Sequence, residues 1–263
     1  MKTKPTQRQL RRGSYLLPTL FTTGNLFFGF FSLVATLRGD FRSAALAIGI
    51  SLLLDGLDGR IARMTNTQTD FGNAFDSLAD VIAFGLSPAL LAFGWGLWNL
   101  GRVGWLASFF FVVCAAARLA RFTVQSGTTD RRYFAGLPTP PAAGLLASLS
   151  FFHPARIETI FSAWLLVALL SIVALLMISK IRYLSFKEVG LQHRQPYTLV
   201  ALLGFAITMI AFDPPFVLLL IASAYVASGP AEWTIRRLRR TPLPKAGPQL
   251  AAKMASDDKT RDL

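Results

Sequence analysis

The sequence is poor in cysteine, histidine and charged residues. It has one cysteine, Cys114, and two histidines, His153 and His193, among 263 residues. One cysteine cannot form an intramolecular disulfide, and zinc sites of the Cys/His type need several such ligands at short spacing. Charged residues make up 16% of the chain, against about 25% in soluble domains. These absences exclude a disulfide scaffold and a cysteine-based metal site, and they argue against a soluble domain.

Long apolar runs take the place of the missing charges. Hydrophobic residues make up 53% of the chain, and several runs approach the roughly 20 residues that a helix needs to cross a bilayer. We therefore predict an all-α, polytopic membrane helical bundle with about eight transmembrane helices. The predicted spans are residues 16–37, 43–63, 72–98, 103–121, 140–153, 159–178, 197–211 and 215–229.

The basic residues indicate how such a bundle is oriented. The net charge is +13, and eight spans would place 23 of the 27 Lys and Arg residues on the same side as both termini. Basic residues collect on the cytoplasmic side of membrane proteins, so we expect a multi-pass protein of the cell membrane with both termini in the cytoplasm. The chain shows no basic stripe interleaved with aromatic residues, so we expect no nucleic-acid partner.

Three regions follow from this pattern. Residues 1–15 form a basic segment suited to the cytoplasmic membrane surface, and residues 16–235 form the transmembrane domain. Residues 236–263 form a basic tail with little apolar content, which predicts disorder.

Four of the 14 acidic residues fall on predicted spans, namely Asp55, Asp58, Asp76 and Asp80. On a helix, the first two share one face and the last two share another. The polar loop 64–70 cannot lie in hydrocarbon, so it makes the two helices antiparallel neighbours. The four carboxylates are therefore expected to converge at the cytoplasmic edge of the membrane.

Converging carboxylates repel one another and are costly to remove from water. Divalent cations relieve both problems, since carboxylate oxygens are the ligands that Mg²⁺ and Mn²⁺ prefer. Ion pairs with Arg60 and Arg63 are the structural alternative, but two arginines cannot balance four aspartates. The pattern thus predicts a metal site.

The four aspartates belong to the longer pattern Asp55-x2-Asp58-Gly59-x2-Ala62-Arg63-x8-Gly72-x3-Asp76-x3-Asp80. This pattern resembles the signature of the CDP-alcohol phosphatidyltransferase family. Residues 117–122 (Ala-Arg-Leu-Ala-Arg-Phe) and 134–140 (Phe-Ala-Gly-Leu-Pro-Thr-Pro) are similar to the phosphatidylserine synthase branch, CDP-diacylglycerol–serine O-phosphatidyltransferase.

The resemblance implies a membrane enzyme that transfers the phosphatidyl group from CDP-diacylglycerol to L-serine and releases CMP. It also implies two Mg²⁺ or Mn²⁺ ions and a homodimer. Asp55 and Asp76 would be shared between the two ions. Asp58 would complete the coordination of the first ion, and Asp80 would complete that of the second. Asp80 would also be the proton acceptor.

The same resemblance implies head-group contacts for Gly59 and Arg63, with Thr69 as an additional contact. A glycine lets the nucleotide lie against the helix, and an arginine can form two hydrogen bonds to phosphate oxygens. Asn25 is expected either to reach the nucleotide or to pack as an amide between helices. Arg118 and Arg121 suit a substrate phosphate, the serine carboxylate or simple anchoring at the cytoplasmic surface.

Other functions remain open at this stage. Another acceptor alcohol, such as glycerol 3-phosphate, inositol or choline, would use the same motif. A prenyltransferase also binds diphosphate through aspartates, but its usual pattern lacks the Gly-x-x-Ala-Arg insert. A cation transporter would be expected to hold its acidic residues near the bilayer midplane, often beside broken helices.

Overall fold

A computed structural model of the chain describes residues 16–65, 69–125, 133–184, 204, 208–209 and 212–238. The chain divides into two compact units, Met1–Gly229 and Pro230–Leu263. The described residues of the second unit are the last turns of one helix, which begins in the first unit.

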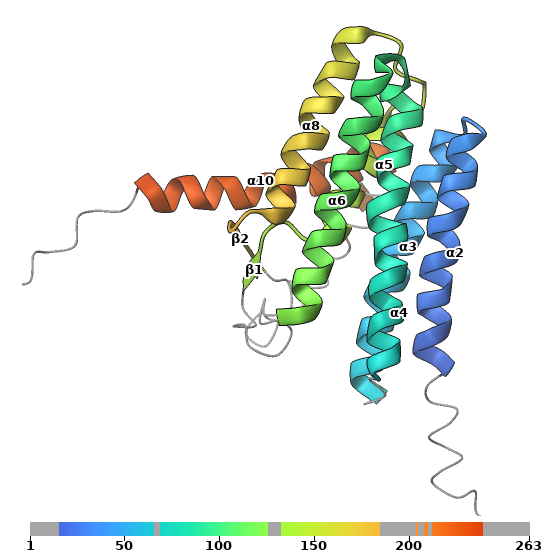
Figure 1. Cartoon of the computed structure of the whole chain (residues 1–263), viewed down its shortest axis with the longest axis vertical. Coiled ribbons are helices and arrows are strands. Elements are labelled where there is room, and N and C mark those ends of the chain that lie inside the picture. The colour runs from blue at the N-terminus through green and yellow to red at the C-terminus, as the bar shows by residue number, and fades with distance from the viewer. Residues whose placement is uncertain are drawn as a thin grey trace, which may run out of the picture. The chain divides into compact units, whose positions relative to one another are not determined.

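Helices cover seven of the eight predicted spans (Figure 1). The predicted span 197–211 falls almost entirely outside the described residues. The α-helices are α2 Leu16–Leu37, α3 Phe41–Thr65, α4 Asp70–Asp80, α5 Ser87–Ala92, α6 Arg102–Gln125, α7 Thr139–Phe152, α8 Ile160–Ile178 and α10 Pro214–Leu238. The structure thus confirms the helical fold.

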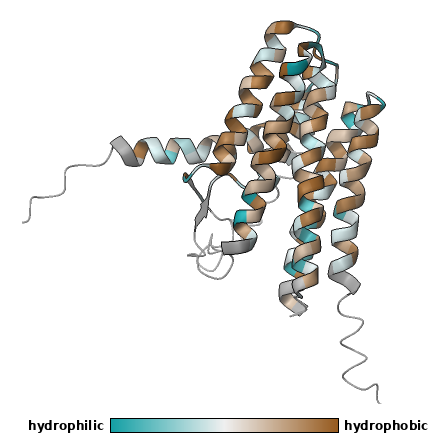
Figure 2. Cartoon of the chain, in the orientation of Figure 1, coloured by the Kyte–Doolittle hydropathy of each residue, from teal (hydrophilic) through white to brown (hydrophobic). Residues whose placement is uncertain are grey.

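Five helical segments of the described chain are long and apolar enough to cross a membrane. They are Thr19–Leu37, Phe71–Leu100, Arg102–Thr123, Ile160–Ile178 and Pro214–Ile235. Helix α3 is long but polar in its second half, and α7 has only 14 residues. Hydrophobic residues dominate α6 and α8 (Figure 2), where large side chains such as Trp105, Phe109 and Trp164 are exposed. A bilayer is the solvent that suits this surface, and the chain is a membrane protein.

Helices α2 and α3 form an antiparallel pair joined by a three-residue turn. Gly39 adopts a positive φ of 75°, which a side chain would disfavour. Asp40 then caps α3 by accepting a hydrogen bond from the backbone N–H of Ser43 at 3.0 Å. Hydrogen bonds from Ser43 lower the pKa of Asp40. The short turn places the start of α3 beside the end of α2, so the two helices pack along their length.

The third predicted span is one continuous helical segment with changing geometry. It begins as α4, turns into a π-helix at Val81–Leu86 (η1), resumes as α5, and ends in a second π-helix, Phe93–Leu97 (η2), and a 3₁₀ turn, Trp98–Leu100 (η3). The hydroxyl of Ser87 donates to the backbone carbonyls of Gly29 and Ile82, both at 2.8 Å. The first π-helix starts directly after Asp80, and such widened turns occur mostly at functional sites.

A two-stranded antiparallel sheet adds to the predicted all-helical fold. Strands β1, Tyr133–Ala135, and β2, Arg182–Leu184, pair with Phe134 opposite Tyr183. The sheet ties the segment before α7 to the segment after α8. A Cβ on Gly136, which has a φ of 84°, would collide with the carbonyl of Met177.

Tyr183 of β2 fixes the described part of α10 within the first unit. Its side chain is fully buried, and its hydroxyl donates to the carbonyl of Val226 at 3.1 Å. Burial raises the pKa of Tyr183 to about 12, so the hydroxyl stays protonated and remains a donor. Its ring packs so closely on Gly229 that any Cβ there would overlap it. The sheet therefore positions α10 through one aromatic side chain.

Candidate functional site

Three carboxylates converge where α3 meets α4. Asp55 lies on α3, and Asp76 and Asp80 lie one turn apart on α4. One oxygen from each lies within 4.8 Å of the other two. A separation of four residues places Asp76 and Asp80 on one helix face, which points at Asp55. The structure thus brings together three of the four predicted aspartates.

Asp58 lies beside this group of three and is held by a separate partner. Its side chain is 3% exposed and accepts a hydrogen bond from the hydroxyl of Thr22 on α2 at 3.1 Å. Its charge nevertheless repels those of Asp76 and Asp80. The four carboxylates therefore form one electrostatic cluster, in which a hydroxyl orients the fourth member.

Asn25 of α2 orients Asp80. The side chain is completely buried, and its amide nitrogen donates to Oδ1 of Asp80 at 3.1 Å. The hydroxyl of Ser51 on α3 lies 2.7 Å from both the side-chain oxygen and the backbone carbonyl of Asn25 and shares its one proton between these two acceptors. These bonds fix the direction of the amide, so that its donor faces Asp80. The geometry favours the role of an amide between helices over direct contact with a nucleotide.

A close contact of α2 with η1 fixes how these two helical segments are aligned along their axes. A Cβ on Gly29 would lie 2.9 Å from the Cα of Ala83, so only glycine permits the observed spacing. Gly29 is one turn beyond Asn25, and Ala83 is three residues beyond Asp80. The contact therefore sets the height at which Asn25 meets Asp80.

The predicted head-group residues lie around the start of α4 and the end of α3. The hydroxyl of Thr69 caps α4 by accepting the backbone N–H of Gly72 at 3.0 Å. Gly59 is exposed, and no atom lies within 4 Å of the place where its Cβ would be. Arg63 lies on α3, but its side chain is outside the described part of the structure.

Arg118 of α6 lies inside the bundle near the same site. Its Nη1 donates to the hydroxyl of Thr139, the first residue of α7, at 3.4 Å. Its buried Nε has no hydrogen-bond partner among the described residues, and its charge interacts with that of Asp80. Arg121, one turn further along α6, is exposed. Arg118 thus combines a cationic group near the cluster with an unused donor.

The residues that the sequence analysis missed are the hydroxyl partners Thr22, Ser51 and Thr139. The sequence carried a signal for Thr22. Polar or small residues recur on α2 at helical spacing, and four of these side chains are buried. They are Thr22, Asn25, Ser32 and Thr36, with Gly29 between them. Such a stripe on an apolar helix predicts a face that packs against polar groups.

The donor set suits a hard divalent cation. Three carboxylates share one small space, and the buried Oδ1 of Asp76 has no hydrogen-bond partner among the described residues. A buried acceptor without a partner is costly, and a cation between the carboxylates would satisfy it while cancelling their repulsion. The residues present therefore fit Mg²⁺ or Mn²⁺.

Comparison with known proteins gives one family for the membrane domain. A family model described as CDP-alcohol phosphatidyltransferase matches residues 15–177. A protein of Helicobacter pylori (strain ATCC 700392 / 26695) named CDP-diacylglycerol–serine O-phosphatidyltransferase is 42% identical over 181 residues, which cover 66% of this chain and 74% of that protein. Proteins of the same name from Bacillus subtilis (strain 168) and Mycobacterium leprae (strain TN) are each 31% identical, over 65% and 82% of this chain and 92% and 73% of their own lengths.

We predict that Gly29→Ala damages the site from a distance. The added methyl meets the backbone of Ala83, and overpacking of this kind costs about 1–3 kcal/mol. Displacement of α2 would also pull Asn25 from Asp80. Purified protein should therefore unfold at a lower temperature and gain less thermal stability from added Mn²⁺.

Gly24→Ala on the same helix is the matched control. Its methyl would meet only the end of the Leu54 side chain, at 3.1 Å, which can rotate away. Equal behaviour of the two variants would contradict the role of the Gly29 contact.

Proposed function

The chain belongs to the CDP-alcohol phosphatidyltransferase family, and from this membership we propose that it makes phosphatidylserine and CMP from CDP-diacylglycerol and L-serine. The observation that carries the proposal is the cluster of Asp55, Asp76 and Asp80, built from the spacing typical of this family. The names of the relatives from three bacterial genera support serine as the acceptor.

The four aspartates would hold two divalent cations, Mg²⁺ or Mn²⁺. Asp55 and Asp76 would be shared between the ions, with Asp58 on the first and Asp80 on the second. When bound, the ions would neutralise charge on the diphosphate and favour the departure of CMP. The hydroxyl of Thr22 donates to one oxygen of Asp58, which would limit the rotation of this carboxylate when an ion is bound.

Asp80 is the proposed proton acceptor. It would take the proton of the serine hydroxyl as the serine oxygen attacks the phosphorus of the phosphatidyl group. The bond from that phosphorus to the oxygen of CMP then breaks, and CMP leaves with its electron pair. Asn25 holds Oδ1 of Asp80 and so orients the carboxylate for proton transfer. Positioning of this kind is a large part of catalysis in phosphoryl transfer.

The head group of CDP-diacylglycerol would lie along the exposed end of α3. The open surface at Gly59 lets the nucleotide approach the backbone, and Arg63 would bind phosphate oxygens. Thr69 is placed at the N-terminus of α4, where backbone N–H groups attract anions. Its hydroxyl already caps the helix, so its contact with the substrate would be a further one.

Arg118 is the proposed anchor for the serine carboxylate. Its unused Nε donor and its closeness to Asp80 suit an amino acid whose hydroxyl must reach that aspartate. Thr139 fixes the guanidinium from the other side. Arg121, which is exposed one turn further along α6, would add positive charge near the site. The Arg118–Thr139 bond joins residues 117–122 with 134–140, the two segments that resemble the phosphatidylserine synthase branch, and this resemblance supports serine as the acceptor.

The remaining parts of the proposal concern assembly and orientation. We place the site at the cytoplasmic surface of the cell membrane, with about eight spans and both termini inside, since 23 of 27 basic residues would then be cytoplasmic. Residues 16–235 would form the catalytic domain between the basic segment 1–15 and the tail 236–263. A homodimer is the proposed assembly.

We predict metal-dependent CMP release with serine as the acceptor. Purified protein in detergent would be given CDP-diacylglycerol, Mn²⁺ or Mg²⁺, and serine, glycerol 3-phosphate, inositol or choline in separate reactions. Serine should give both CMP and phosphatidylserine, and chelation of the metal should stop the reaction. Release of CMP with another alcohol alone would overturn the acceptor, and absence of release with every alcohol would overturn the transferase.

We predict that Asp80→Asn abolishes transfer while CDP-diacylglycerol still binds. Loss of a general base costs at least about a hundredfold in turnover, whereas the amide keeps the shape of the side chain. Turnover and CDP-diacylglycerol binding would be measured on the same preparation. Asp40→Asn, at the exposed cap of α3, is the control and should leave both unchanged. Near-normal turnover of Asp80→Asn would show that another group accepts the proton.

A further inference from the structure

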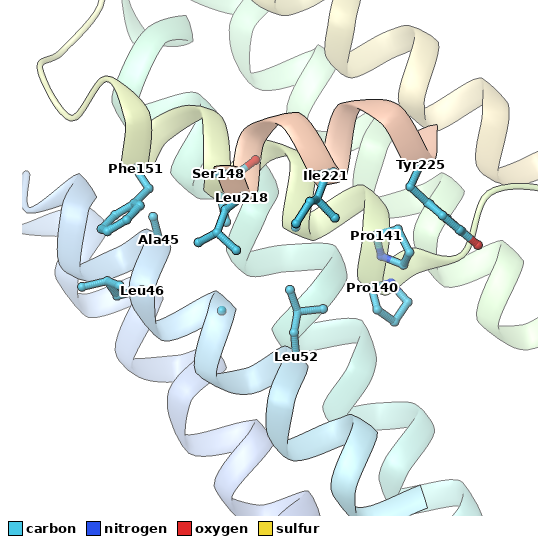
Figure 3. Close-up of a pocket in the computed structure, with 14 residues that line it drawn as sticks. Ala45, Leu46, Leu52, Pro140, Pro141, Ser148, Phe151, Leu218, Ile221 and Tyr225 are labelled. Carbon is cyan, nitrogen blue, oxygen red and sulfur yellow. The ribbon is translucent and has the colours of Figure 1, made fainter. Parts of the chain in front are cut away.

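An apolar cavity of about 380 Å³ lies between α3, α7 and α10, within the first compact unit (Figure 3). Its lining is aliphatic or aromatic except for the hydroxyls of Ser148 and Tyr225. The Ser148 hydroxyl donates to the carbonyl of Leu145 at 2.9 Å, so it does not call for a polar ligand. The volume falls in the range of ligand pockets, about 300–1,000 Å³, and the lining suits a hydrocarbon.

The cavity lies on the helix face that leads to the proposed head-group residues. Three of the four α3 residues that line the cavity, Ala45, Gly49 and Leu52, lie within an arc of about 60° at about 100° per residue. The same arc, widened to about 80°, includes the positions of Gly59 and Arg63 further along α3. A lipid whose head group contacts these last two positions would reach the cavity if its tail ran along this face of α3.

The two ends of the cavity differ in chemistry. Tyr225, Pro140 and Pro141 lie at one end, while Phe151, Ala45 and Leu46 lie at the other (Figure 3). Tyr225 interacts electrostatically with Arg118, and Pro140 follows Thr139, the hydrogen-bond partner of Arg118. The end with Tyr225 thus borders the proposed catalytic site, and the end with Phe151 is the apolar terminus.

From these observations we propose that the cavity binds one acyl chain of CDP-diacylglycerol, with its methyl end toward Phe151, and that Gly49 sets the length of chain it accepts. This inference rests on the proposed function. The occupant is the substrate rather than a bulk lipid because the cavity continues the head-group face of α3 and borders Arg118.

Gly49 is the position where the cavity can be shortened without disturbing the fold. No atom lies within 4 Å of the place where its Cβ would be, so a side chain there points into open space. Leu52 and Ala45 are seven residues apart, or about 10 Å along the helix axis, and Gly49 lies between them. A larger residue at 49 would therefore block the half of the cavity near Phe151 and leave the half near Tyr225 open.

The test compares acyl chains of two lengths in Gly49→Leu. Turnover would be measured with dioctanoyl and dipalmitoyl CDP-diacylglycerol in detergent micelles, with serine and Mn²⁺. We expect near wild-type turnover for the short substrate and a loss of about tenfold or more in kcat/KM for the long one, as pockets discriminate by methylene count. Ile50→Phe is the matched control, because Ile50 is the next residue on α3, is 38% exposed and does not line the cavity. If the ratio of kcat/KM for the dioctanoyl substrate to kcat/KM for the dipalmitoyl substrate were the same in Gly49→Leu as in the wild type, the proposal would be overturned.

A photolabelling measurement tests whether an acyl chain occupies the cavity, independently of turnover. CDP-diacylglycerol with a photoreactive group at the end of one acyl chain should label residues around Phe151 and Leu218 in the wild type, but not in Gly49→Leu. Unlabelled CDP-diacylglycerol should compete, whereas the same excess of phosphatidylglycerol should not. Equal competition by both lipids would show a general lipid site and overturn the proposal. Labelling as expected in a protein that releases no CMP would uphold the cavity and reject the transferase.

Discussion

The mutual repulsion of four carboxylates within an apolar helical bundle is the constraint on which the site depends. Asp55, Asp76 and Asp80 crowd one small space, and Asp58 adds its charge from the side. Such a cluster is costly in a poorly solvated position and persists only with groups that stabilise the charges. The protein supplies part of this stabilisation through hydroxyl and amide donors, and divalent cations would supply the rest.

Helix α2 provides those donors, and its packing against η1 places them beside the aspartates. Thr22 binds Asp58, and Asn25 binds Asp80. The close contact of Gly29 with Ala83 holds α2 at the height that both bonds require. The change to π geometry directly after Asp80 shifts the following residues around the helix axis, and Ser87 then bonds to the Gly29 carbonyl.

The sequence predicted the helices of the described residues and the acidic cluster because both depend on local periodicity, whereas five of these helical segments are long and apolar enough to cross a membrane. Apolar runs of bilayer length and aspartates three or four residues apart can be read without knowledge of the tertiary fold. The bonds of Asn25 and Arg118 could not be predicted, since each joins residues on different helices, whose register depends on packing. The sheet between 133–135 and 182–184 was missed because three-residue strands carry too little pattern to be recognised. The contact of the Arg63 side chain with the substrate head group remains a prediction, and so does the span 197–211.

In the proposed function, helix α3 would serve two tasks on different faces. One face carries Asp55 and Asp58 toward the carboxylate cluster, and a neighbouring face carries Gly59 and the apolar cavity residues. A lipid substrate needs both, because its diphosphate must meet cations while its chains stay in an apolar environment. The antiparallel packing of α3 on α2 serves the first face, and the packing of α7 and α10 serves the second.

The central claim is that the aspartate cluster is a site for divalent cations, and direct measurement of Mn²⁺ binding tests it most directly. Electron paramagnetic resonance of the purified protein, titrated with Mn²⁺ in the presence of CDP-diacylglycerol, would give the number of bound ions and show whether they are neighbours. We expect about two ions per chain with magnetic coupling between them, and loss of the coupled signal in Asp76→Asn. Uncoupled binding, or the same signal in wild type and Asp76→Asn, would contradict it.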